Sequence, residues 1–186
     1  MNILKKEMQE TAVMPGPEFR FAEEEDIPLI LYFIKELAAC EDMSDEVTAT
    51  EELLRENLFK TRNAEVIFVL DEGKEAGFAL FYRTFSTFLG LPGIHLEDLY
   101  IRPEYRRKGY GKSLLEELAR IVGERGYGRL EWECLDRNRR GIDFYLAFGA
   151  EPLSDRTTYR FLPGSLSPDD GRKDPAEHGS ETEKKI

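Results

Sequence analysis

The 186-residue sequence has few of the residues that build disulfide scaffolds and metal sites. It contains two cysteines, Cys40 and Cys134, and two histidines, His95 and His178. Neither a CxxC pair nor a Cys/His cluster occurs, which excludes a zinc finger and a multi-disulfide framework. We therefore expect reduced cysteines and no metal.

Long apolar runs are also missing. No segment approaches the roughly 18 apolar residues of a transmembrane helix. The lysines near the N-terminus are not followed by the apolar stretch of a signal peptide. The sequence thus predicts neither a membrane span nor export, and we expect a cytoplasmic protein.

Positive charge is scarce. Lys and Arg number 26 against 37 Asp and Glu, and the net charge is −11 at pH 7. A protein that binds nucleic acid or rests on anionic lipid needs a basic face. The composition therefore argues against nucleic-acid and membrane partners, and it is compatible with a cationic partner.

The charges are distributed unevenly along the chain. Residues 18–60 hold thirteen acidic residues and four basic ones, whereas residues 102–112 hold five basic residues and one acidic. A locally cationic segment in an acidic chain indicates a site for a multiply charged anion. The acidic part of the chain favours a cationic molecule.

Composition divides the chain into three parts. Residues 1–17 are expected to be a flexible extension, and residues 163–186, rich in Pro, Gly, Ser and charge, a disordered tail. The remaining 18–162 are long enough for one domain. Their apolar patterning predicts the order β-α-α-β-β-β-α-β-α-β, ending in a strand over 157–162. This order predicts an α/β (α+β) fold with a mixed, mostly antiparallel sheet flanked by helices.

A glycine-containing basic loop, residues 106–112, leads from an apolar strand into a helix. Gly109 and Gly111 allow the backbone to approach a ligand, and the N-terminus of the helix favours an anion. Arg106 stands where a P-loop needs its first glycine, and Leu114 where a dinucleotide-binding loop needs its third. What remains is an R-x-x-G-x-G loop for an anion, or else a tight turn with solvated charges.

The R-x-x-G-x-G pattern resembles the pyrophosphate loop of the GCN5-related N-acetyltransferases, the GNAT superfamily. The resemblance extends over 18–162 and is nearest to the diamine (spermidine/spermine) and thialysine acetyltransferase branch. It is carried by Ile34–Ala38, Leu96–Ile101, the glycine loop and Asn138–Ala150. The resemblance implies the GNAT fold, acetyl-CoA as donor, a homodimer, and a diamine- or polyamine-like primary amine as acceptor.

The resemblance also implies roles for single residues. Tyr145 would be the general acid that protonates coenzyme A, and Glu97 would help to deprotonate the amine. Asn138 lies seven residues before Tyr145, about two helical turns, so both can line one side of a cofactor groove. The alternative for Tyr145 is a position in an aromatic core stripe.

Glu97 and Asp98 are consecutive acids in a strand that is otherwise apolar, which is costly unless they meet a cleft, a partner or water. Alternation predicts two faces. One carries His95, Glu97, Leu99 and Ile101, and the other carries Leu96, Asp98 and Tyr100. The alternative for Glu97 is a rim position or a pair with a structural arginine.

Two sets of ligand contacts follow from the resemblance. The implied acceptor contacts are Glu41, Glu97 and Asp98. The implied coenzyme A contacts are Leu99, Tyr100, Ile101, Arg106, Arg107, Lys108, Gly109, Tyr110, Gly111, Lys112 and Asn138.

Two alternative functions stay open. One is acetylation of a thialysine-like or lysine-like amino acid or another small amine, where Arg83 or Arg156 could supply the cation for a carboxylate. The other is a non-catalytic acyl-CoA-binding sensor, against which the presence of both Tyr145 and Glu97 argues.

Overall fold

One sheet organises the computed structural model, which describes residues 16–162. Its strands are β1 (Glu18–Phe21), β2 (Glu65–Asp71), β3 (Lys74–Ser86), β4 (Leu91–Ile101) and β5 (Leu130–Trp132), adjacent in that order. The strands β1 to β4 pair antiparallel, whereas β5 runs parallel to β4. A parallel pair needs a crossover connection, and a helix supplies it.

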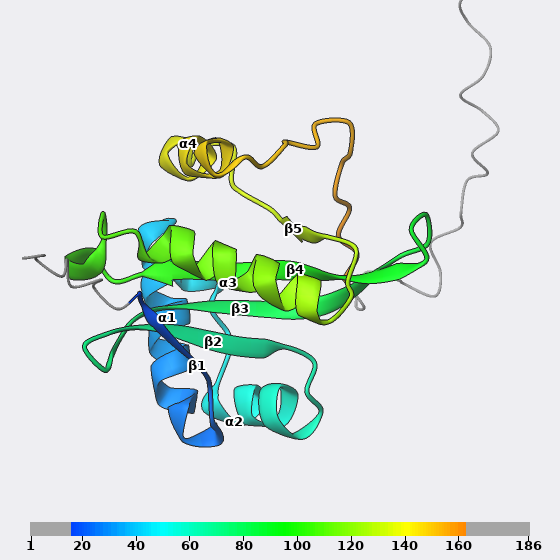
Figure 1. Ribbon diagram of the computed structural model, residues 1–186. Helices are drawn as coiled ribbons and strands as arrows, with labels where there is room; N and C mark the ends of the chain where they lie inside the picture. The colour runs from blue at the N-terminus through cyan, green and yellow to red at the C-terminus, as the bar shows by residue number, and fades with distance from the viewer. Residues whose placement is uncertain (1–15, 163–186) are drawn as a thin grey trace, which may run out of the picture. The chain divides into compact units, whose positions relative to one another are not determined.

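Helices lie on both faces of this sheet (Figure 1). They are α1 (Ile27–Cys40), α2 (Glu51–Leu54), α3 (Tyr110–Glu124) and α4 (Arg139–Phe148). A π-helical segment, Arg55–Lys60, continues α2, and 3₁₀ turns occur at Glu24–Asp26, Ser44–Glu46 and Pro103–Tyr105. The expected mixed α/β fold is confirmed. Within residues 16–162, no helix is both long and apolar enough to cross a membrane.

The sheet has an apolar core on each face. Because neighbouring residues of a strand point to opposite faces, β2 contributes Ile67 and Val69 to the α3 side and Val66 and Phe68 to the α1 side. The α3 side also buries Leu114, Leu115 and Leu118, and the α1 side buries Ile30, Phe33, Phe78 and Tyr100. The strand β4 contributes buried residues to both cores.

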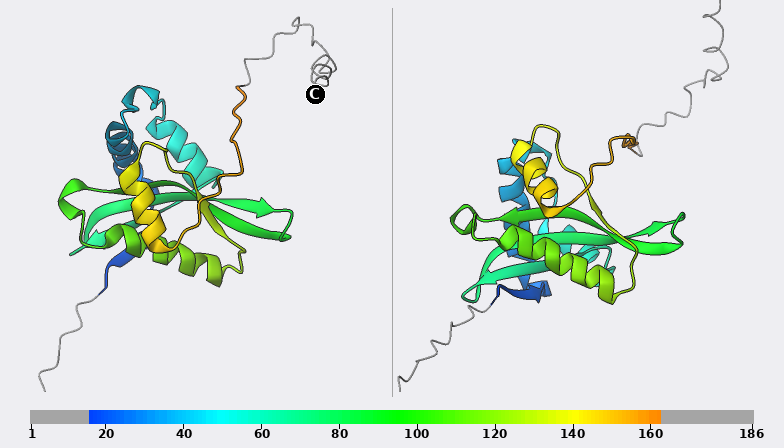
Figure 2. Two further views of the ribbon diagram at one scale, coloured as in Figure 1. Left: turned by 90° about the horizontal axis from the view of Figure 1, so that it is seen from above. Right: turned by 45° about the horizontal axis from the view of Figure 1, so that its top comes forward.

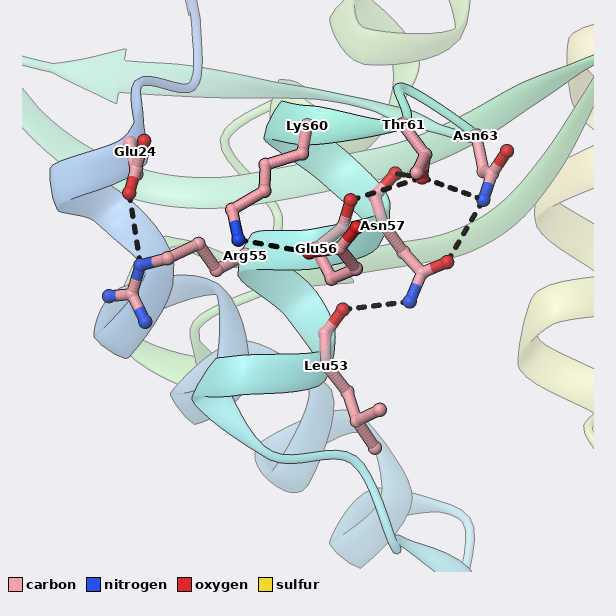
Figure 3. A network of polar contacts seen from close by, with 8 residues as sticks. All are labelled: Glu24, Leu53, Arg55, Glu56, Asn57, Lys60, Thr61 and Asn63. Carbon is pink, nitrogen blue, oxygen red and sulfur yellow. Dashed lines mark hydrogen bonds and ion pairs between the residues drawn. The ribbon is translucent and has the colours of Figure 1, made fainter.

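A polar network fixes the chain between the second helix and β2 (Figure 3). The Asn57 amide donates to the carbonyl oxygen of Leu53 at 2.9 Å and accepts from the Asn63 amide at 2.9 Å. The Thr61 hydroxyl donates to the carbonyl oxygen of Glu56 at 3.0 Å. These bonds use the extra carbonyls of the π-helical turn and lead the chain directly into β2.

Residues 149–162 form a unit separate from residues 16–148 within the described part of the chain. The closing strand expected over 157–162 is wrong, because these residues have no regular secondary structure. A strand needs a neighbour that satisfies its N–H and C=O groups, and none of the described strands pairs with this segment. Tyr159 is accordingly 91% exposed.

The strand β4 contains an extra residue at Glu97. Asp98 lies opposite Leu80 and Leu96 lies opposite Phe81, so Glu97 has no partner on β3. Such a β-bulge bends its strand and shifts the alternation of side chains by one position.

The bulge corrects the predicted faces of β4. Leu96 packs in the α3-side core together with Leu99 and Ile101, whereas Tyr100 packs in the α1-side core. Strict alternation had separated Leu96 from Leu99. The extra residue is the reason that they share a face.

The strands β4 and β5 part soon after they meet. Their pairing covers three positions, Ile94 to Leu96 against Leu130 to Trp132. After Trp132 the chain leaves the sheet toward α4 (Figure 2). The edge of β4 from Glu97 to Ile101 therefore has no described strand beside it on this side.

Candidate functional site

Four carboxylates line a hollow of about 340 Å³ between the end of α1, the segment that follows it and the bulge of β4. The acidic residues are Glu41, Glu46, Glu97 and Asp98, and the apolar ones include Leu37, Ala38, Met43 and Val47. None of the described lining residues is basic. We call this the acidic hollow, and its charge suits a cation with a short carbon chain. It contains all three predicted acceptor contacts.

Asp98 is the most enclosed carboxyl of the acidic hollow. Burial, and then the neighbouring charges of Glu97 and Glu41, raise the pKa of Asp98 from 3.8 to about 6. The shift means that the ionised form lacks solvation and a compensating cation. A bound ammonium group would supply that cation.

Glu97 lies at the bulge, where its side chain is 56% exposed. Its carboxylate lies 3.8 Å from the imidazole Nε2 of His95, and the His95 ring stacks on Tyr82 with 5.0 Å between centroids. No described arginine or lysine contacts Glu97 among the ion pairs of residues 16–162. The carboxylate is thus available to a ligand in the acidic hollow.

Tyr145 comes from α4, where its ring packs against Trp132 at 5.1 Å between centroids and against Phe144 at 5.2 Å. Burial, followed by the Cys134 and Glu41 charges, raises the pKa of Tyr145 to about 12. The hydroxyl thus keeps its proton at neutral pH. It makes no hydrogen bond with any described residue, so this proton is not committed to the protein.

Glu41 connects the two sides of the site. Its charge raises the pKa of Asp98 in β4 and also the pKa of Tyr145 in α4. Electrostatic influence on both groups requires that Glu41 lie near each of them. The fold therefore brings together Tyr145 and the acids Glu41 and Asp98, which come from separate parts of the sequence.

The glycine loop has the backbone conformation that its sequence requires. Gly109 precedes α3 with a φ of 91°, and Arg107 has a φ of 65°, both in the left-handed region. Gly111 is the second residue of α3, and a Cβ there would lie 3.4 Å from the Phe144 ring. The loop therefore leads into the free amides at the start of α3, and the first turn of α3 lies beside the Phe144 ring of α4.

The cations of the loop have different partners. Arg106 donates to the carbonyl oxygen of Ile101 at 2.9 Å and contacts the Cys40 sulfur at 3.4 Å. Lys108 pairs with Asp71 at 2.9 Å.

Two further cations of the loop are Lys112 and Arg107. Lys112 pairs with Glu116 on the next turn of α3. Arg107 is exposed and has no partner within residues 16–162, which leaves it free for an anion.

Three predicted cofactor contacts have structural roles in addition. The Asn138 side-chain oxygen accepts from the Gly141 amide at 2.9 Å and so caps α4. Tyr100 is 3% exposed, and its hydroxyl donates to Glu36 at 3.3 Å. The Tyr110 hydroxyl hydrogen bonds with Asp71.

The backbone of Tyr100 faces Phe78 of β3, because Arg102, two residues later, donates to the Ala76 carbonyl on that same side. The backbone groups at the open edge of β4 are those of Leu99 and Ile101.

The sequence analysis missed Glu46 in the acidic hollow and Asp71 beside the loop. Glu46 lies in the 3₁₀ turn after α1 and Asp71 is the last residue of β2, and neither periodicity nor motif spacing indicates a site at either position. Only the fold places them.

The residues present fit an elongated nucleotide thioester. The open edge of β4 offers backbone groups without a strand partner, and the left-handed Gly109 precedes the free amides of α3, which favour an anion. No group of three or more His, Cys, Asp or Glu within residues 16–162 is placed to hold a metal ion.

Comparison with known proteins identifies a family and several relatives. The sequence profile described as "Acetyltransferase (GNAT) family" matches residues 31–150. A thialysine N-epsilon-acetyltransferase from Bos taurus is 36% identical over 145 residues, which is 73% of this chain and 85% of that protein. An L-ornithine N5-acetyltransferase from Arabidopsis thaliana is 28% identical and covers 79% of this chain and 85% of its own.

A solved structure shares the fold. An integron cassette protein from the mobile metagenome of V. cholerae superposes with a TM-score of 0.67, at 23% identity, over 80% of this chain and 94% of its own.

We predict that Asp98→Asn stabilises the protein at neutral pH and much less in acid. The folded-state pKa of about 6 exceeds the ordinary 3.8, so the penalty for ionisation grows as the pH rises between these values and is complete above them. The gain in the free energy of unfolding should be on the order of 2 kcal/mol at pH 8. Urea denaturation at pH 4.5 and pH 8 measures it.

The control for this prediction is Asp45→Asn, at an exposed carboxyl of the 3₁₀ turn after α1. It should change stability little at either pH. An equal gain from Asp98→Asn at both pH values, or a loss at pH 8, would contradict the assigned burial.

Proposed function

The chain belongs to the GNAT acetyltransferase family, and we propose that it transfers the acetyl group of acetyl-CoA to a primary amine of a small cationic acceptor. The observation that supports this most is the meeting, at the Glu97 bulge, of an acidic hollow and an open strand edge. The hollow suits an amine and the edge suits the arm of coenzyme A. Direct attack follows from their adjacency, without a covalent enzyme intermediate.

The glycine loop would hold the phosphates of acetyl-CoA, which supplies an activated thioester. Arg107 and the amides that follow Gly109 are the free groups, and Lys108 and Lys112 could exchange their carboxylate partners for phosphate. The backbone of Leu99 to Ile101 would bind the pantetheine arm and polarise the acetyl carbonyl. Asn138, through its amide nitrogen, would contact the same arm.

The acids of the hollow prepare the amine. An ammonium ion cannot attack a thioester, so it must first lose a proton. Asp98 and Glu41 bind the acceptor's positive charge, and Glu97, half-exposed at the bulge, accepts the proton through water. The freed nitrogen then forms the C–N bond as the C–S bond breaks, and it loses its second proton to water.

Tyr145 completes the proton transfers. Its hydroxyl has a pKa of about 12 and no partner among the described residues, so it holds a proton that it can donate to the departing thiolate. The same step restores an ordinary thiol on coenzyme A. Solvent then reprotonates the phenolate.

Two acceptor classes fit the hollow. Diamines and polyamines need only carboxylates, and the four acids supply them. Amino acids with a terminal amine are the second class, favoured by the relatives named for thialysine and L-ornithine.

Domain bounds, oligomeric state and location are also part of the proposal. We propose a domain over 18–162, a homodimer and a cytoplasmic location, as the family resemblance and the composition imply. The acidic composition supports an absence of nucleic-acid and membrane partners.

The proposed function is tested by an acceptor panel. We expect acetyl-CoA-dependent thiol release with at least one of spermidine, 1,3-diaminopropane, thialysine and lysine, and an N-acetylated product by mass spectrometry. Norleucine, which has the lysine skeleton without the terminal amine, should not be acetylated. Coenzyme A binding without turnover on any amine would instead favour an acyl-CoA sensor.

We predict that Tyr145→Phe lowers kcat by about 100- to 10,000-fold, because the thiolate then leaves without a proton donor. Affinity for coenzyme A should change little, since Phe keeps the ring contacts with Trp132 and Phe144. Steady-state kinetics and calorimetry measure the two effects. Tyr127→Phe, at the turn after α3, is the matched control, and an unchanged kcat in Tyr145→Phe would refute its role.

We predict that Glu97→Gln lowers kcat/KM for the acceptor by about 100-fold at pH 7. The defect should shrink toward pH 9.5, because a primary amine with a pKa of about 10 increasingly loses its proton to solvent. A pH profile of both enzymes measures this. Glu46→Gln removes a charge from the same hollow and should give a smaller loss without this pH dependence, whereas a constant Glu97→Gln defect would argue against proton transfer.

A further inference from the structure

The segment between β5 and α4 brings one guanidinium to the rim of the acidic hollow. Arg137 Nη2 donates a 2.6 Å hydrogen bond to the carbonyl oxygen of Glu41. Glu41 itself lines the hollow, so the guanidinium is in direct contact with a lining residue. In residues 16–162, Arg137 is the one arginine or lysine that contacts a residue of this lining.

The other candidate cations have contacts elsewhere. Arg83 lies over the Tyr127 ring at 6.0 Å, and Arg156 lies 3.7 Å from Asp155 in the separate unit 149–162. Arg83 is not among the residues that line the acidic hollow. Arg106 is directed at Ile101 and Cys40.

Arg137 has capacity for a ligand. A guanidinium carries five N–H donors in a planar fork, and the Glu41 carbonyl uses one of them. Arg137 is exposed and pairs with no carboxylate in the described part of the chain. The remaining donors can therefore bind a carboxylate in the two-bond geometry that arginine favours.

We propose that Arg137 is a specificity-determining residue, which binds the carboxylate of an acceptor amino acid whose terminal amine is acetylated in the acidic hollow. The assignment rests on the proposed acetyl transfer and identifies the acceptor as an α-amino acid with a terminal primary amine. The acids of the hollow bind its two ammonium groups, and Arg137 binds its third charged group.

Charge balance supports this assignment. Four carboxylates around the hollow repel a further carboxylate, so an amino acid is rejected unless a cation stands at the rim. A diamine lacks the carboxylate and has no use for that cation. Arg137 is therefore expected to separate the two acceptor classes, whichever acid binds the reacting amine.

Matched acceptor pairs test the proposal. Ornithine and putrescine, and lysine and cadaverine, differ only in the carboxylate. We expect Arg137→Ala to raise KM for ornithine or lysine about 10- to 100-fold, as for loss of a charge-assisted hydrogen bond, with kcat little changed. The KM for the diamines should move less than about threefold, and Arg137→Lys should lie between wild type and Arg137→Ala for the amino acids.

Control variants separate recognition from support of the fold. Arg140→Ala removes a nearby exposed charge on α4. It should change the KM values for amino acids and for diamines only slightly and to the same extent. If Arg137→Ala does not fold, Arg137→Gln, which keeps a donor for the Glu41 carbonyl, replaces it. Thermal unfolding shows whether Arg137→Ala and Arg137→Gln are folded.

Equal KM changes for an amino acid and its diamine would overturn the assignment, because an arginine that only holds the end of α1 acts on both alike. A wild-type enzyme that acetylates diamines but neither amino acid would also overturn it, while leaving the proposed acetyl transfer intact. Absence of turnover with all four acceptors would overturn the proposed function itself.

Discussion

The extra residue at Glu97 gives β4 two different halves. Before the bulge, β4 is paired on both edges, to β3 and to β5; after it, only the β3 side is paired. A strand edge without a neighbour leaves N–H and C=O groups that must find partners. The same bulge brings two acids to the hollow beside α1. An unpaired backbone edge and an acidic surface therefore begin at one residue.

Asp98, beside the bulge, and Tyr145 have shifted pKa values. Burial and neighbouring acids hold Asp98 at a pKa of about 6, and burial with Glu41 holds Tyr145 at about 12. Perturbed groups of this kind concentrate at functional sites, where stability is sacrificed for binding or proton transfer. The loop beside α3 carries the opposite charge, but two of its cations, Lys108 and Lys112, pair with Asp71 and Glu116. Among the described residues, the acids of the hollow form no ion pair with a lysine or arginine.

Local patterns in the sequence predicted the mixed fold and the glycine loop, because strand alternation, helical periodicity and left-handed glycines leave local signatures. They also indicated Glu97 and Asp98 as acids in an apolar strand, and the family resemblance added Glu41. The fold brings all three to one hollow. The faces of β4 were mispredicted, since a bulge depends on the partner strand and not on β4 alone.

The closing strand over 157–162 was wrong for a related reason: alternation describes side chains, whereas a strand also needs an edge to pair with. The contacts of Lys108 with Asp71 and of Arg137 with Glu41 join residues far apart in the chain. No local signal contains them. The cofactor contacts and the roles of Tyr145 and Glu97 remain predictions.

The start of α3 and the Phe144 ring are about one methyl group apart. A Cβ at Gly111 would lie 3.4 Å from that ring, which is ordinary van der Waals contact, so alanine has room at this position. Phe144 precedes Tyr145 in the chain, and their rings lie 5.2 Å apart between centroids. A side chain longer than alanine at Gly111 would therefore press on Phe144 and, through it, on the position of Tyr145.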